Sequence, residues 1–217
     1  MRHLRRLSIP TILENKHEEW TKKFLEKKTT HPKLRPDNSK YAHKDIVEKL
    51  HSISSHKCFY SEELLKENYK EIDHYIEVDE EPDLAYSWDN LYLSSEICNN
   101  KLPNKDIPTT ETLNPFINND QQIEENLYFE DEYILSNTIL GEKTISKFRL
   151  DNEKLDNKRR KVLQKFHQQF LEIKDELIKD GRSYYSEEEL KKLQRFAHFS
   201  SPFSLMFKYT LKKHNLL

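Results

Sequence analysis

The stretch EIDHYIEVDEEPDLAYSWDNLYLSSEICNNKLP, residues 71–103, decides the predicted fold of this chain. Short apolar segments at 72–76 and 91–93 indicate two strands, and an acidic loop separates them. The spacing after the second strand allows a helix that begins near Ser94 and carries Asn99 on its second turn. We therefore expect an α+β fold with a small strand–strand–helix unit.

Polar residues at fixed intervals give this unit its predicted chemistry. A hard cation such as Mg²⁺ prefers oxygen ligands and keeps several waters, so one carboxylate and one amide suffice to hold it; Asp73 and Asn99 are the predicted metal ligands. His74, with an ordinary pKa of about 6.5, can accept a proton from water. Asn90 is predicted to hold the loop and the His74 ring, which makes His74 and Asn90 the predicted catalytic pair for phosphodiester hydrolysis. The alternative is a structural Asp-His pair with amide helix caps.

The pattern resembles the HNH (ββα-metal) nuclease family. Asp73-His74 matches its first signature, a His at a strand end that often follows an acid. Residues 90–93 (NLYL) match the second, and residues 98–101 (CNNK) match the third, nine residues later. The resemblance implies a small ββα-metal HNH core embedded in a mainly helical body, with Mg²⁺ or Mn²⁺ as cofactor. Further candidates for substrate contact or support are Asn100, Lys101 and His56.

Two cysteines mark a departure from that family. Many HNH proteins bind a structural zinc through two Cys-x-x-Cys pairs, whereas this chain reads Cys58-x-x-Ser61 and Ser95-x-x-Cys98. Because a hydroxyl is a poor Zn²⁺ ligand next to a thiolate, we predict no structural zinc. Cys58 and Cys98 are expected to meet in space, either as apolar filler or as a reducible pair.

A second resemblance lies outside this unit, in residues 1–10, 57–60, 113–115, 145–160 and 201–204. These segments resemble the PtuB family, the HNH effectors of bacterial Septu anti-phage systems and of related retron-associated systems. The resemblance implies a partner, the ABC-type ATPase PtuA, which holds the nuclease in check. It also implies a nucleic-acid substrate, either DNA or an RNA such as tRNA, and in some systems a retron reverse transcriptase with its msDNA.

Periodicity predicts the remaining elements. Helices are expected over 11–28, 43–54 and about 152–179, the last ending at Gly181, and a final helix begins at the capping box of Ser186 and Glu189. Residues 29–41 should form a loop, residues 61–63 a helix cap, and residues 127–135 a hairpin. The predicted regions are a helical N-terminal region for partner docking (1–57), the HNH core (58–120), and the hairpin with C-terminal helices (121–217).

Composition and charge limit the function classes. Only two glycines are present, so a glycine-rich phosphate loop is excluded, and two cysteines do not make a disulfide framework. No apolar run approaches the roughly 20 residues of a membrane helix, and we expect a cytoplasmic bacterial protein. Residues 1–57 carry a net charge of +7, residues 58–135 one of −16, and residues 136–217 one of +7. A polyanion would be repelled by the middle third unless a cation sits there; solvated helix faces explain the basic flanks equally well.

These observations favour a metal-dependent endonuclease controlled by an ATPase partner. The alternative is a catalytically inactive HNH-like subunit that scaffolds or regulates the ATPase. A nuclease that acts alone with its own sequence specificity is disfavoured, because the chain shows no recognisable specificity domain.

Overall fold

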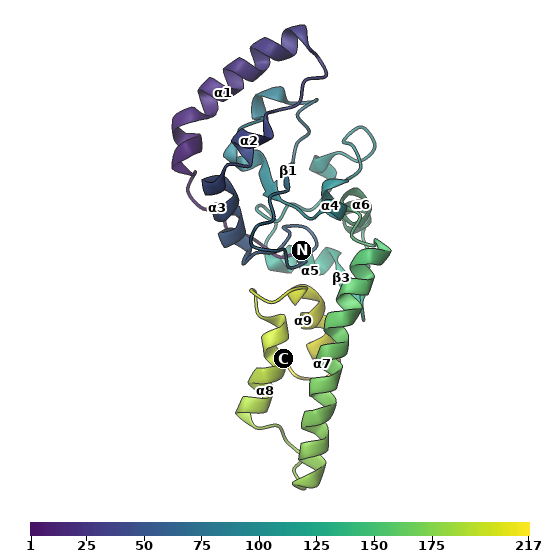
Figure 1. Ribbon diagram of the computed structural model, residues 1–217. Helices are drawn as coiled ribbons and strands as arrows, with labels where there is room; N and C mark the ends of the chain where they lie inside the picture. Colours follow the sequence, from purple (N-terminus) through teal and green to yellow (C-terminus); the bar gives the residue numbers. More distant parts are fainter.

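The computed structural model describes all residues, 1–217, and divides into a body and a projecting arm (Figure 1). The body surrounds a hydrophobic cluster of 31 buried residues, which draws members from all three predicted regions, from Leu13 through Leu91 to Leu205. A second cluster of 10 buried residues lies in the arm (residues 162–217). Phe129 packs against both clusters and so marks the seam between body and arm.

Helices from the N-terminal region cover one end of the body. Helix α1 (Thr11–Thr30) and α3 (Lys44–Ser54) confirm the predicted helices. The four apolar residues expected to face inward from α3 are all buried, namely Ile46, Val47, Leu50 and Ile53. The predicted loop at 29–41 was wrong at its end: one helical turn, α2 (Asn38–Tyr41), forms there because the Asp37 side chain accepts a hydrogen bond from the backbone N–H of Ser39.

The centre of the body holds the expected strand–strand–helix unit. Strand β1 (Ile72–His74) pairs antiparallel with β2 (Leu91–Leu93), and Asp73 lies opposite Tyr92. The connecting loop contains two short 3₁₀ turns, η1 (Pro82–Leu84) and η2 (Trp88–Asn90). Helix α4 (Glu96–Asn99) follows β2 and is capped by Ser95. Asn99 is therefore the last residue of a single turn and does not lie on a second one.

The predicted helix cap at residues 61–63 was wrong. This segment is a tight turn closed by an antiparallel bridge between Lys57 and Leu64, and Glu62 adopts a left-handed conformation with φ of 60°. The buried Glu62 carboxylate accepts hydrogen bonds from the Ser204 hydroxyl at 2.6 Å and the Leu205 N–H at 3.1 Å. The turn therefore anchors the start of the last helix against the body.

The C-terminal half follows the predicted order with two additions. The hairpin is confirmed as β3 (Tyr128–Glu130) paired with β4 (Tyr133–Leu135). The capping box at Ser186 and the left-handed Gly181, with φ of 62°, are confirmed as well. The other elements are η3 (Thr109–Glu111), α5 (Asp120–Asn126), α6 (Ile139–Phe148), α7 (Glu153–Lys179), α8 (Glu187–Gln194), η4 (Arg195–Ala197) and α9 (Ser204–Lys213). Helices α5 and α6 were not predicted.

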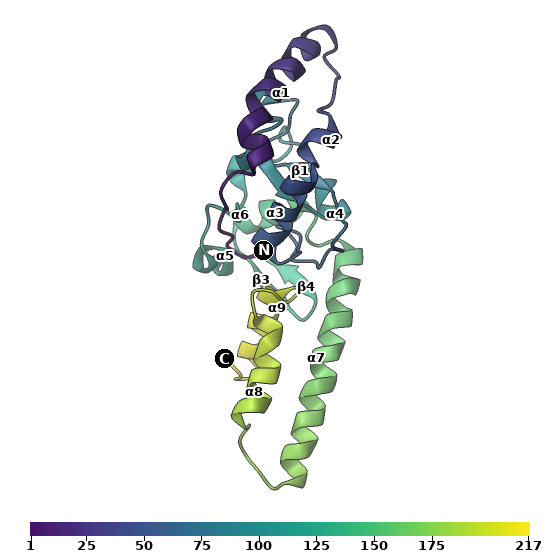
Figure 2. The same cartoon turned by 60° about the vertical axis from the view of Figure 1, so that its left-hand side comes forward.

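The arm consists of the outer part of α7 with α8 and α9 packed beside it (Figure 2). Helix α7 leads away from the body, and the chain returns along it through α8. No helix of the chain combines the length and the apolar character needed to cross a lipid bilayer.

Candidate active site

The predicted acid, imidazole and distant amide meet at one cleft of about 450 Å³. Asp73 and His74 reach it from the end of β1, and Asn99 reaches it from the end of α4. Lys101, two residues beyond α4, lines the cleft as well. The other charged or aromatic residues that line it are Arg35, Tyr41, Glu77 and Asp79.

Asp73 is held through one of its two carboxylate oxygens. Its Oδ2 accepts a hydrogen bond from the Tyr60 hydroxyl at 2.7 Å and one from Lys101 Nζ at 2.8 Å. No protein group donates to Oδ1. Since both donors meet the same oxygen, the other oxygen remains available to a ligand in the cleft.

His74 is oriented by a backbone carbonyl. Its Nε2 lies 2.8 Å from the carbonyl oxygen of Ala85, and a carbonyl can only accept, so Nε2 carries the ring proton. The lone pair is then on Nδ1, which is the nitrogen able to take a proton. Burial lowers the pKa of His74, although the Ala85 carbonyl and the charge of Asp73 oppose that effect. The neutral, basic form therefore predominates at neutral pH.

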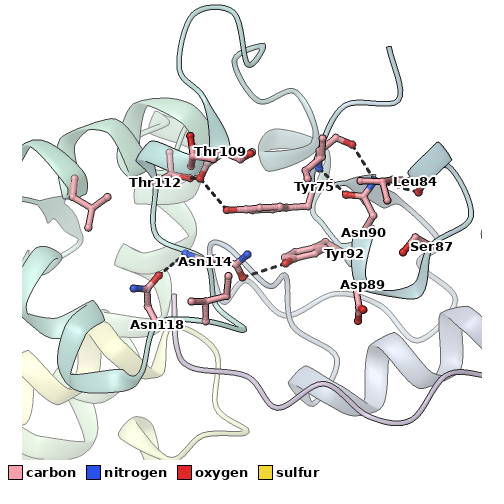
Figure 3. Close-up of a pocket in the computed structure, with 14 residues that line it drawn as sticks. Tyr75, Leu84, Ser87, Asp89, Asn90, Tyr92, Thr109, Thr112, Asn114 and Asn118 are labelled. Carbon is pink, nitrogen blue, oxygen red and sulfur yellow. Dashed lines mark hydrogen bonds between the residues drawn. The ribbon is translucent and has the colours of Figure 1, made fainter. Parts of the chain in front are cut away.

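Asn90 holds the loop between the strands and does not line the cleft. Its Oδ1 accepts from the Ile76 N–H at 2.7 Å, and its Nδ2 donates to the carbonyls of Ile76 at 3.0 Å and Leu84 at 3.3 Å (Figure 3). It faces a separate pocket of about 540 Å³, together with Tyr75 and Tyr92. Every polar atom of the Asn90 side chain is used to hold the loop, which is the role predicted for it; its part in catalysis stays a prediction.

Asn99 offers a free amide to the cleft. Helix α4 is fixed by Ser95, whose Oγ accepts from the Cys98 N–H at 3.4 Å. The Asn99 side chain is exposed and makes no hydrogen bond within the protein. Its amide oxygen is therefore available as a ligand.

Two other candidates lie outside the cleft. Asn100 lines a different pocket, and its Nδ2 donates to the Glu96 carbonyl at 3.0 Å. The His56 ring interacts with His51, with the two Nδ1 atoms 3.1 Å apart. Neither side chain lines the cleft at Asp73, and their roles in substrate contact or support stay predictions.

Lys101 holds the Asp73 carboxylate and the backbone at the end of β1. Its Nζ donates to Asp73 Oδ2 and to the carbonyls of His74 at 2.6 Å and Tyr75 at 2.8 Å. An ammonium group has three N–H donors, so all of them are used. The side chain is 5% exposed. Of the two predicted roles, substrate contact or support, the structure therefore favours support.

The donor set suits a hard divalent cation. Asp73 Oδ1 and the Asn99 amide are oxygen donors on one cleft, and such a cation completes its coordination with water. No group of three or more His, Cys, Asp or Glu side chains that could hold a metal ion occurs in the chain, at this cleft or elsewhere. The fit rests on this pair, and the bound cation stays a prediction.

Cys58 and Cys98 meet in the core as free thiols, as predicted. Burial, with hydrogen bonding to Cys58, raises the pKa of Cys98 well above its ordinary value. Burial opposes ionisation of Cys58 too, but hydrogen bonds from Cys98 and Ser61 outweigh it and lower the pKa of Cys58 to about 6. Ser61 and Ser95 lie beside the pair. The four positions that would hold a zinc are thus together in space, and the absence of zinc stays a prediction.

No protein-family model matches the chain. The Septu protein PtuB of Bacillus thuringiensis is 31% identical to it over 119 residues, which make up 54% of this chain and 43% of that protein. The similarity supports the PtuB family. The chain spans less than half of the length of this PtuB protein.

Three site features were missed by the sequence reasoning. Tyr60 belongs to the segment that resembles PtuB, but its bond to Asp73 depends on tertiary packing. The Ala85 carbonyl carries no side-chain signature at all. Glu77 lies in the acidic loop expected between the two strands, and its Oε1 accepts from the Asn104 N–H at 2.9 Å, a contact that the sequence did not indicate. The spacing within residues 71–103 could have revealed none of these contacts.

Proposed function

We propose that the chain is a metal-dependent endonuclease of the HNH type that hydrolyses phosphodiester bonds in DNA or RNA. The observation that carries this proposal is the orientation of His74. With Nε2 donating to Ala85, the basic nitrogen is Nδ1, and His74 lines one cleft together with Asp73, whose Oδ1 has no protein partner, and Asn99. A general base beside free oxygen ligands is the combination that phosphodiester hydrolysis needs.

In this proposal His74 Nδ1 accepts the proton of the attacking water. Asp73 and Asn99 would hold the divalent cation, which when bound supplies stabilisation of negative charge on the phosphate and on the leaving oxygen. Tyr60 and Lys101 keep the Asp73 carboxylate in one orientation. Asn90 keeps the loop in place, and through the Ala85 carbonyl it keeps the imidazole in place.

The similarity to PtuB leads us to propose a component of Septu anti-phage defence. Within such a system the chain would be the nuclease effector, and an ABC-type ATPase of the PtuA type would bind it and restrain it. Residues 1–57 are the proposed docking region. A retron reverse transcriptase with its msDNA is the corresponding partner in a retron-associated system, and the proposed compartment is the bacterial cytoplasm.

One observation favours the second candidate, an inactive subunit that scaffolds or regulates the ATPase. The ammonium of Lys101 pairs with Asp73, the carboxylate that would hold the cation. A site whose carboxylate is already paired to a lysine is compatible with lost catalysis.

The two candidates are separated by cleavage assays on the assembled complex. Labelled plasmid and total RNA would be incubated with the complex, Mg²⁺ or Mn²⁺, and varied nucleotide. We expect cleavage by the wild type and by His31→Ala, an exposed control, and none by His74→Ala. Cleavage by His74→Ala at the wild-type rate would exclude the proposed base, and no cleavage by any complex would favour the inactive subunit.

A further inference from the structure

Every carboxylate that lines the cleft is paired with a cation of the protein itself. Asp73 pairs with Lys101 at 2.8 Å, and Glu77 lies 3.6 Å from Lys147 Nζ. The pairing of Asp79 involves two cations, Lys28 at 2.9 Å and Arg35 at 3.2 Å. The cleft is therefore close to neutral, although it lies in the acidic third of the sequence.

The cations come from distant parts of the chain. Lys28 and Arg35 belong to the basic N-terminal region, and Lys147 belongs to α6 in the basic C-terminal region. The basic flanks thus supply the cations that pair with Glu77 and Asp79 in the loop between β1 and β2. A cation was expected in the middle third, and these side chains supply positive charge there without any bound ion.

Lys101 and Lys147 are fixed in position. The side chain of Lys147 is fully buried, and its Nζ donates to Asn104 Oδ1 at 2.6 Å. Asn104 in turn binds the loop, through its N–H to Glu77 and through its Nδ2 to Glu80 Oε2 at 2.5 Å. The segment 101–104 is thereby tied to residues 73–80, so neither ammonium can withdraw without breaking several hydrogen bonds.

We infer that Lys101 is a positioning residue whose ammonium balances the charge of the Asp73 carboxylate before any ion binds. A divalent cation therefore binds this cleft firmly only together with a phosphodiester. The inference rests on the proposed function and deepens it, because it sets the order in which cation and substrate assemble. A dication next to a fixed ammonium meets repulsion, and in the free protein only Asp73 Oδ1 and Glu77 Oε2, the two carboxylate oxygens of the cleft without a protein partner, are left to offset it. A bound phosphodiester adds anionic oxygens to the cleft, and their attraction for the dication offsets the repulsion by the Lys101 ammonium.

The test measures Mn²⁺ binding by electron paramagnetic resonance, without reference to cleavage. The samples are the wild type, Lys101→Met and Lys101→Arg, with Lys105→Met as a matched control, since Lys105 is an exposed lysine of the same segment. We expect Lys101→Met to bind Mn²⁺ at least about tenfold more tightly than the wild type, because the repulsion is gone. Lys101→Arg and Lys105→Met should resemble the wild type, and adding Asp73→Asn to Lys101→Met should abolish the gain.

A second measurement uses the wild type alone. A non-hydrolysable dinucleoside phosphorothioate should raise its Mn²⁺ affinity at least about tenfold. If Lys101→Met does not fold, this measurement tests the inference by itself. Unchanged or weaker Mn²⁺ binding by folded Lys101→Met would overturn the inference, as would tight wild-type binding that ignores the dinucleotide. Cleavage with unaltered Mn²⁺ affinities would remove this inference alone, whereas the expected affinities without cleavage would remove only the proposed nuclease activity.

Discussion

The Tyr60 hydroxyl donates a 2.7 Å hydrogen bond to Asp73 Oδ2. The Tyr60 ring is stacked on Phe148, with centroids 4.1 Å apart and an angle of 13° between the planes. The orientation of the proposed ligand at the end of β1 is thus linked to α6, an element far along the sequence. A buried aromatic ring with a polar tip serves this purpose well, because packing fixes the ring and the hydroxyl fixes the carboxylate.

Tyr60→Phe keeps the stacked ring and removes only the hydroxyl. We expect a loss of about 1–2 kcal/mol in the free energy of unfolding, since a buried hydrogen bond to a carboxylate disappears while Lys101 still pairs with Asp73. Cleavage should fall as well, because the carboxylate gains freedom. Urea denaturation and cleavage assays measure the two effects, with the exposed Tyr184→Phe as control. Equal stability of Tyr60→Phe and the wild type would contradict the prediction that this hydrogen bond stabilises the fold.

The pH dependence of cleavage should report His74. Burial lowers its pKa, and the active form is the neutral ring, so activity should be retained down to pH values below the ordinary pKa of about 6.5. The same shift affects stability: the unfolded chain binds the proton more tightly, so stability is lost as the pH falls from about 6.5 through the folded pKa. His74→Gln should weaken that dependence in denaturation experiments. An acid limb of cleavage centred above pH 6.5 would count against the assignment.

Asn90→Asp tests the loop that carries Ala85. The carboxylate can still accept from the Ile76 N–H, but its second oxygen faces the carbonyls of Ile76 and Leu84. We expect destabilisation of about 2–4 kcal/mol and a loss of cleavage, because the buried donor is replaced by a charged acceptor. Asn157→Asp, an exposed position on α7, is the control. Full activity of Asn90→Asp would show that His74 is positioned without this loop.

We predict that a zinc site can be built around Cys58 and Cys98 by replacing the two serines beside them. Ser61→Cys combined with Ser95→Cys places four thiols where two thiols and two hydroxyls now meet, and four thiolates suit tetrahedral Zn²⁺. Elemental analysis should find one zinc per chain in the double variant and none in the wild type. Losing the Ser95 cap of α4 should cost about 1 kcal/mol, which bound zinc would offset. A zinc-free double variant would mean that the four positions do not form a tetrahedral site.

Residues 71–103 predicted the strands, the helix and the shared position of Asp73, His74 and Asn99, because local spacing fixes all of these. The pairings of Tyr60 and Lys101 with Asp73 were not predictable, since they arise from packing between separate segments. Helix α6 escaped notice because Gly141 and β-branched residues lower its intrinsic helix propensity, and tertiary packing stabilises it instead. Helix α5 does carry a detectable signal, a capping box of Asn119 and Gln122.

The two hydrophobic clusters are expected to differ in how easily they open. The guanidinium of Arg159 lies 5.3 Å from the Phe129 ring at the seam, and α9 is tied to the body because Leu205 belongs to the body cluster and Ser204 donates to Glu62. Helix α8 packs its buried Leu193 in the second cluster alone, so this helix can open while the body stays folded. In amide hydrogen exchange this corresponds to two protection levels, with β1 and β2 exchanging more slowly than α8.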